Sequence, residues 1–226
     1  MIGPVDTAKL LDAVRHHPCG TLLAGQLLAV LAYPFLDDSP VGRATLGILG
    51  MGLVAAAIWA VRFTPVLAWV AVVIGIPAMA FTVAEAVSPD TGWIVLVSAL
   101  LHAPFYFYVS WAMVRHLYAD DRVTRDELFA IGAAFTVVAW GFAYLYAAVQ
   151  VVWPGSFVSP TADEQTWFEL LFVSFTNLTS VGFSDIVPTT EHARSIVIVQ
   201  QFTGVLYVAM VVSRLVGLTV ARAKQR

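Results

Sequence analysis

The chain has 226 residues, of which 59% are hydrophobic and 12% are charged, and its mean hydropathy is +0.81. This composition excludes an ordinary water-soluble globular protein, because a soluble core does not bury so large a share of apolar side chains. The net charge of −3 also excludes nucleic acid as a partner, since no basic stripe is available to neutralise phosphates. We therefore expect membrane lipid to surround most of the chain.

The N-terminal segment, residues 1–20, is predicted to be a cytoplasmic tail or a short interfacial helix. Lys9 and Arg15 are separated from the first apolar run and alternate with Asp6 and Asp12, a pattern that argues against a cleavable signal peptide. The single cysteine, Cys19, excludes an intrachain disulfide and a metal site made of several thiolates.

Apolar stretches then follow one another along the chain, and each is close to the length of about 20 residues that a transmembrane helix requires. In chain order they cover residues 21–36, 41–63, 65–87, 92–115, 126–153 and 193–220. A shorter helical stretch, residues 164–178, precedes the last of them. We therefore expect an all-α membrane protein with six transmembrane helices.

The positions of Lys and Arg predict the orientation, because short cytoplasmic loops are enriched in these residues. With the N-terminus in the cytoplasm, Arg43 and Arg194 fall outside and the rest of the 12 basic residues fall inside. The cytoplasmic set is Lys9, Arg15, Arg62, Arg115, Arg122, Arg125, Arg214, Arg222, Lys224 and Arg226. We expect a multi-pass protein of the plasma (inner) membrane with both termini in the cytoplasm.

The longest cytoplasmic connection, residues 116–125, separates a four-helix membrane domain, residues 21–115, from the C-terminal region. The fourth helix carries no Lys or Arg between Gly92 and Val114, so we expect no strong voltage sensing by this domain. Thr124 or Asp126 is predicted to cap the fifth helix. Residues 1–226 indicate no soluble partner and no regulatory domain.

A polar, glycine-containing segment lies between the last two apolar stretches. Residues 167–188 read Trp-Phe-Glu-Leu-Leu-Phe-Val-Ser-Phe-Thr-Asn-Leu-Thr-Ser-Val-Gly-Phe-Ser-Asp-Ile-Val-Pro. A short helix followed by an extended stretch is too short to cross a bilayer twice. Non-helical backbone is tolerated at membrane depth only where protein or an aqueous path surrounds it, so this segment is predicted to be re-entrant.

This segment resembles a known family. The run Thr179-Ser180-Val181-Gly182-Phe183-Ser184-Asp185 is similar to the potassium-channel signature Thr-Thr-Val-Gly-Tyr-Gly-Asp. The resemblance implies that residues 126–226 form a pore domain, with outer helix 126–153, pore helix 164–178, selectivity filter 179–185 and inner helix 193–220. It also implies a homotetramer in lipid that conducts K+ passively, with permeant K+ as the only ion and no cofactor.

The resemblance further assigns a role to each filter residue. The implied K+ ligands are the backbone carbonyls of Ser180, Val181, Gly182 and Phe183. The hydroxyl of Thr179 or Ser180 would complete the innermost site, and Asp185 would stand at the outer mouth. These oxygen ligands suit a hard monovalent cation.

Two departures from the family pattern bear on selectivity. Ser184 replaces the second glycine, and we expect it to adopt a positive φ at a cost of about 1–3 kcal/mol, which would distort the outermost ion site. Phe183 replaces tyrosine and removes a hydroxyl that could tie the filter to the pore helix. Both departures leave a weakly selective monovalent cation channel as an alternative.

The last apolar stretch contains a candidate gating hinge, Gly204, near the position at which inner helices of this family bend. The competing role is close helix packing, which is common for glycine in membrane helices. The apolar side chains around it are predicted to line the pore; they are Phe202, Val205, Tyr207, Val208 and Met210.

Other classes of function make different demands. A secondary transporter would show inverted repeats, whereas only one interrupted segment is present. An enzyme would need clustered catalytic groups, whereas the histidines are scattered and no catalytic spacing is found, so we expect no enzymatic activity. A non-conducting accessory subunit stays an alternative.

His102 is a candidate proton sensor, with a hydrogen bond between helices as the competing role.

Overall fold

The computed structural model describes residues 18–36, 39–60, 65–88, 91–117 and 125–224, and this part of the chain is almost entirely helical. The elements in chain order are α2 (Pro18–Leu36), α3 (Pro40–Ala60), α4 (Pro65–Val87), α5 (Gly92–Leu117), α6 (Arg125–Val152), β1 (Phe157–Val158), α7 (Trp167–Leu178), β2 (Val187–Pro188) and α8 (Glu191–Lys224). β1 and β2 form a small antiparallel pair in which Phe157 faces Pro188.

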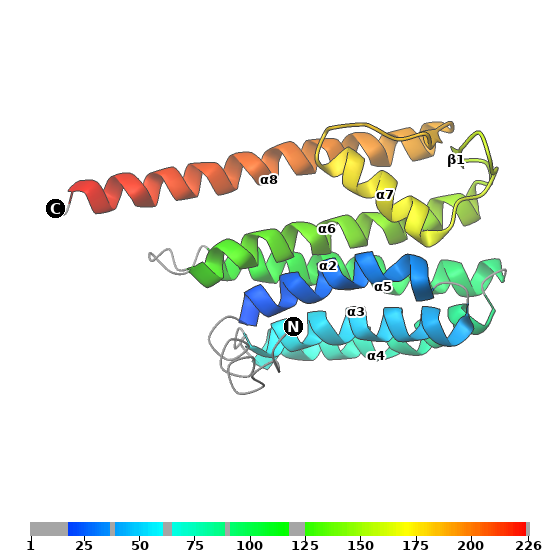
Figure 1. Ribbon diagram of the computed structural model, residues 1–226, viewed down its shortest axis with the longest axis horizontal. Helices are drawn as coiled ribbons and strands as arrows, with labels where there is room; N and C mark the ends of the chain where they lie inside the picture. Colours follow the sequence, from blue (N-terminus) through cyan, green and yellow to red (C-terminus); the bar gives the residue numbers. More distant parts are fainter. Residues whose placement is uncertain (1–17, 37–38, 61–64, 89–90, 118–124, 225–226) are drawn as a thin grey trace, which may run out of the picture.

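The helices α2 to α6 lie side by side as a bundle, and α8 runs along one side of it (Figure 1). The short helix α7 lies between α6 and α8 near one end of the molecule, and the C-terminal part of α8 extends beyond α7 toward the other end (Figure 1). α6 packs against α2 and α5 on one side and against α7 and α8 on the other. It therefore joins the N-terminal helices to the C-terminal ones within a single chain.

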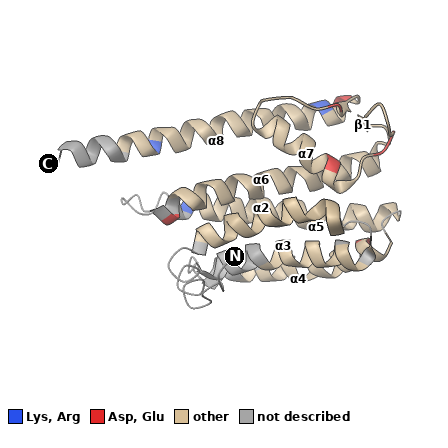
Figure 2. Cartoon of the chain, in the orientation of Figure 1, with Lys and Arg blue, Asp and Glu red and all other residues tan. Residues whose placement is uncertain are grey.

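Four of the described helices are long and apolar enough to cross a membrane. They are Cys19–Leu36, Gly92–Arg115, Leu128–Val152 and Glu191–Gly217. The described charged residues lie mainly toward the two ends of the molecule (Figure 2). These features support a membrane protein. α3 and α4 are also helical, with 21 and 23 residues, and the count of six spans stays a prediction.

Several helix boundaries differ from the predicted ones. α2 begins at Pro18, inside the segment predicted to be a tail, and α8 exceeds the predicted 193–220 at both ends. α7 begins at Trp167 and not at residue 164, because Thr166 forms a capping box with Glu169. The Thr166 hydroxyl accepts a hydrogen bond from the Glu169 N–H at 3.3 Å, and the Glu169 carboxylate accepts one from the Thr166 N–H at 2.7 Å.

Replacing this cap gives a first test of the local structure. Thr166→Ala is expected to lower the free energy of unfolding by about 1 kcal/mol, because the Glu169 N–H loses its acceptor and the Glu169 carboxylate loses the Thr166 hydroxyl as a donor. Thermal unfolding in detergent, followed by circular dichroism, measures the change. Thr161→Ala is the matched control, since the Thr161 hydroxyl contacts only the Ser159 hydroxyl and caps no helix. Equal shifts for both variants would contradict the assignment.

Asp126 caps a helix other than its own. Its carboxylate accepts hydrogen bonds from the N–H groups of Cys19 at 3.1 Å and Gly20 at 3.3 Å, which lie at the start of α2. The carboxylate satisfies two unpaired donors there and complements the helix dipole. The other predicted cap, Thr124, lies outside the described residues. This contact fastens the start of α2 to the start of α6.

Candidate functional site

The backbone reverses direction directly after α7. The N–H of Thr179 donates to the carbonyl of Phe175 and that of Ser180 donates to Asn177, each at 3.0 Å. The N–H groups of Val181 and Gly182 then both donate to the carbonyl of Thr176, also at 3.0 Å. These bonds satisfy the carbonyls that a helix end leaves free. The chain therefore wraps around the end of α7 before it becomes extended.

Two residues of this turn have left-handed backbone conformations, Ser180 with φ of 58° and Gly182 with φ of 66°. The positive φ expected at Ser184 is not found. The Ser184 hydroxyl instead accepts a hydrogen bond from the N–H of Ile186 at 3.0 Å, which stabilises a local turn without glycine. The strained non-glycine position is thus Ser180, at a cost of about 1–2 kcal/mol.

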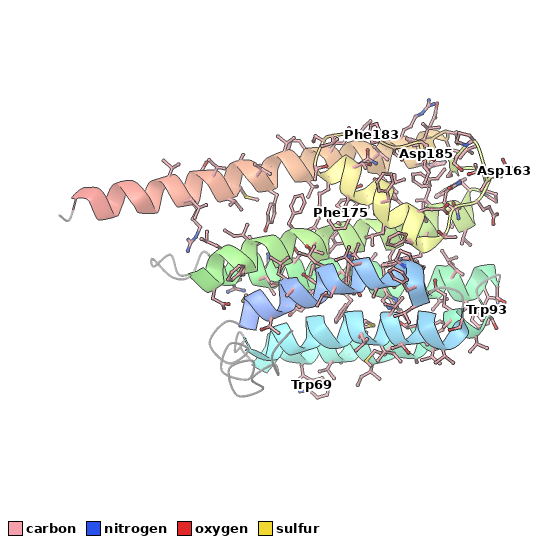
Figure 3. The ribbon with its side chains drawn as sticks, in the orientation of Figure 1. Trp69, Trp93, Asp163, Phe175, Phe183 and Asp185 are labelled. Atoms are coloured by element: carbon pink, nitrogen blue, oxygen red, sulfur yellow. The ribbon has the colours of Figure 1, made fainter. Side chains whose placement is uncertain are left out.

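The side chains of the predicted filter are exposed in the single chain. Val181 is 70% exposed and Phe183 is 81% exposed, whereas Ile186 is buried and anchors the end of the segment. Phe183 and Asp185 lie on the loop at the side of the molecule away from α3 and α4 (Figure 3). The Thr179 hydroxyl is already engaged, because it donates to the carbonyl of Phe175 at 2.8 Å.

The carbonyl groups of this loop form a row of unused acceptors. Those of Ser180, Val181, Gly182 and Phe183 accept no hydrogen bond from the described residues. A backbone carbonyl without a partner is costly away from water, and each has two lone pairs available. The segment therefore offers consecutive backbone oxygens to a ligand or to solvent.

A buried polar network fixes α7 against α6 and α8. The Gln200 side chain donates to the carbonyl of Ser174 at 3.0 Å and to its hydroxyl at 2.6 Å, and it accepts a hydrogen bond from the Tyr146 hydroxyl. The Ser174 hydroxyl in turn donates to the carbonyl of Ala139 at 2.6 Å. Because Tyr146, Ser174 and Gln200 are fully buried, each unmade bond would leave a desolvated polar group. The network joins α6, α7 and α8.

This network was not predicted from the sequence. The available signal was the presence of three polar side chains, Tyr146, Ser174 and Gln200, inside apolar helical stretches. Polar groups in such surroundings need partners from neighbouring helices. The spacing along the chain does not reveal which helices supply them.

Gly204 lies where α8 passes the end of α7. A Cβ atom at this position would lie 1.9 Å from the carbonyl oxygen of Leu178 and 2.8 Å from its carbonyl carbon. α8 runs through Gly204 without interruption. The structure thus gives Gly204 a packing role, and its predicted role as a gating hinge stays a prediction.

α8 presents an apolar surface that the other described residues leave uncovered. Phe202, Val205, Val208 and Met210 are exposed, as expected for side chains that line a pore or contact another subunit. The prediction is wrong for Tyr207, which is buried against α6. Its hydroxyl donates to the carbonyl of Ile131 at 2.6 Å, so the aromatic ring fixes α8 to α6.

A family model described as "Ion channel" matches residues 131–221. The match begins in α6 and ends in α8, so it contains α7, the predicted filter and the buried network. It supports an ion channel, and together with the apolar helices it indicates a membrane protein. No curated protein and no solved structure matches the chain.

Proposed function

We propose that the chain is one subunit of a homotetrameric channel that conducts K+ passively through the backbone carbonyls of residues 179–184. In this proposal α7 and the loop after it are re-entrant, six helices span the plasma (inner) membrane, and both termini are cytoplasmic. The observation that carries the proposal is the row of four unused carbonyls from Ser180 to Phe183. In a protein surrounded by lipid, such a row is stable where dehydrated cations replace the missing donors.

The exposure of the same loop supports four copies. A single chain presents these carbonyls on an open side and cannot surround an ion. Four chains around a common axis would enclose the row and would also cover the exposed faces of Val181 and Phe202. The C-terminal end of α7 would then point its negative dipole end toward the axis, which favours a cation.

Selectivity separates the two leading alternatives. Ser184 in place of glycine and Phe183 in place of tyrosine favour a weakly selective monovalent cation channel. The Ser184 hydroxyl accepts a hydrogen bond from the Ile186 N–H, so the outermost carbonyl lies in a turn of its own. Val181 and Gly182 match the signature, and Ser180 keeps a hydroxyl where the signature has threonine. We therefore propose K+ selectivity that depends on the inner three positions.

Ion flux into liposomes that contain the purified chain tests this function. Gly182→Ala is expected to lower K+ flux by at least about tenfold, because alanine resists a φ of 66° by about 1–2 kcal/mol and shifts the carbonyls. Gly155→Ala is the matched control: Gly155 has φ of 76° and, like Gly182, has open space around its Cβ position. Gly155 lies before β1, outside the predicted filter, so the Gly155→Ala variant should conduct K+ at the native rate.

The other outcomes have distinct meanings. Equal fluxes of K+ and Na+ through the native chain would favour the weakly selective channel. Uptake of K+ against its gradient, driven by a second ion, would favour a transporter. A native tetramer without flux of either ion would contradict conduction and favour an accessory subunit.

A further inference from the structure

A cavity of about 600 Å³ lies between the N-terminal helices and the start of α7. Its walls come from α2, α3, α4, α5, α6 and α7, and the exposed residues Gly92, Pro154, Glu164 and Thr166 mark its mouth. Pro154, Glu164 and Thr166 belong to the connection between the end of α6 and the start of α7, at one end of the bundle (Figure 1). The volume falls in the range of sites for small molecules.

The charge of the cavity is of one sign. Glu85 and Glu164 are the charged side chains among its described lining residues, and no Lys, Arg or His is among them. Glu85 is partly buried in the last turn of α4, where the carbonyl end of the helix adds further negative potential. A carboxylate removed from water is costly without a cationic partner. The cavity therefore favours a cation as its occupant.

Aromatic rings share the cavity wall with this carboxylate. The aromatic lining residues are Tyr33, Tyr106, Trp140, Tyr144, Trp167 and Phe168. The centre of the Tyr144 ring lies 5.8 Å from that of Tyr106 and 5.3 Å from that of Trp167, so aromatic side chains of α5, α6 and α7 meet in this wall. Ring faces attract organic cations, most strongly where water is excluded.

Two donors in the same wall lack an acceptor. The indole N–H groups of Trp140 and Trp167 are buried and form no hydrogen bond with the described residues. Trp140 itself is only 4% exposed. A ligand that combines a cationic centre with a hydroxyl or carbonyl oxygen would satisfy both the carboxylate and an indole donor.

We propose that this cavity binds a small organic cation of the amine or quaternary ammonium class, with Glu85 as its counter-ion and the aromatic residues as its cage. Trp167, Phe168 and Leu171 belong both to the cavity wall and to α7. The occupant would therefore touch the helix that carries the predicted filter. The binding step stands by itself, whereas any effect on ion flux rests on the proposed function.

Calorimetry on the full-length protein in nanodiscs of phosphatidylglycerol, a lipid without a choline headgroup, tests the binding step. The probes are choline and its neutral analogue 3,3-dimethylbutan-1-ol. Choline is expected to bind at least about tenfold more tightly than the analogue, because only the cation pairs with Glu85 and the rings. Equal binding of both would show a merely apolar cavity and would overturn the proposal, as would the absence of choline binding.

Variants locate the site. Glu85→Gln is expected to weaken choline binding by about tenfold or more, and Tyr144→Leu provides a second variant if the first does not fold. Glu191→Gln is the matched control, because Glu191 is exposed at the start of α8 and does not line the cavity. Unchanged binding in both cavity variants would overturn the assignment.

A flux measurement tests the link to the pore. Choline added on the outer side should change K+ flux through the native chain and Glu191→Gln but not through Glu85→Gln. A flux effect that persists in Glu85→Gln would place choline in the pore and would overturn the link. If no variant conducts, the proposed function fails, while calorimetry still decides whether the cavity binds the cation.

Discussion

Gly204→Ala is expected to abolish K+ flux and to lower the free energy of unfolding by about 2–4 kcal/mol. The added Cβ would overlap the carbonyl group of Leu178, and this neighbour is backbone that no side-chain rotation can move aside. α8 must therefore shift away from the end of α7. Since the predicted filter begins directly after Leu178, the shift reaches the carbonyl row. Thermal unfolding in detergent and liposome flux measure the two effects.

Gly217→Ala on the same helix is the matched control. Nothing lies within 4 Å of a Cβ at this position, so alanine should stabilise the helix by about 0.5–1 kcal/mol. The pair also separates the two roles of Gly204. Full thermal stability of Gly204→Ala together with altered flux would favour the hinge, whereas unchanged stability and unchanged flux would contradict the close contact.

Gln200→Leu is expected to produce the second large effect, a loss of about 2–4 kcal/mol in the free energy of unfolding together with reduced flux. Leucine fills a similar volume but leaves the Tyr146 hydroxyl without an acceptor and the Ser174 carbonyl without this donor. These groups are fully buried, so water does not replace the missing partner. α7 then loses its polar attachment to α8.

The adjacent residue provides the control for this change. Gln201 is exposed, and its hydrogen bond to the Asn177 side chain is long, at 3.5 Å. Gln201→Leu should alter the free energy of unfolding by no more than about 0.5 kcal/mol, as measured by the same thermal unfolding. A Gln200→Leu variant as stable as Gln201→Leu would show that the network does not hold the helix.

The sequence predicted the features that depend on local composition. Apolar runs located the long helices, because the length of such a run is set by the membrane and needs no knowledge of neighbours. α4 was predicted with its observed bounds, residues 65–87. The signature at residues 179–185 placed the candidate filter inside the segment that the ion-channel family model matches.

Features that depend on distant partners could not be predicted. Asp126 has the composition of a cap for its own helix, yet it caps α2, which precedes it by more than a hundred residues. Tyr207 has the hydropathy of a pore-lining residue, and only the position of Ile131 shows that it faces α6. The positive φ expected at Ser184 occurs at Ser180, where the chain turns back so that the next two N–H groups reach the Thr176 carbonyl; at Ser184 a bond from an N–H to the hydroxyl forms the turn.

The packing of α6 limits how much lipid this helix can contact. Of its apolar window, Leu128–Val152, 67% is buried inside the chain, against 22% for the window of α8. α2 and α5 occupy the places where lipid tails would otherwise contact this helix. In a bilayer, changes in thickness or lateral pressure would therefore act on α2 and α5 before they act on the face of α6 that these helices cover. Along this face, α6 is solvated by helices of its own chain and not by lipid.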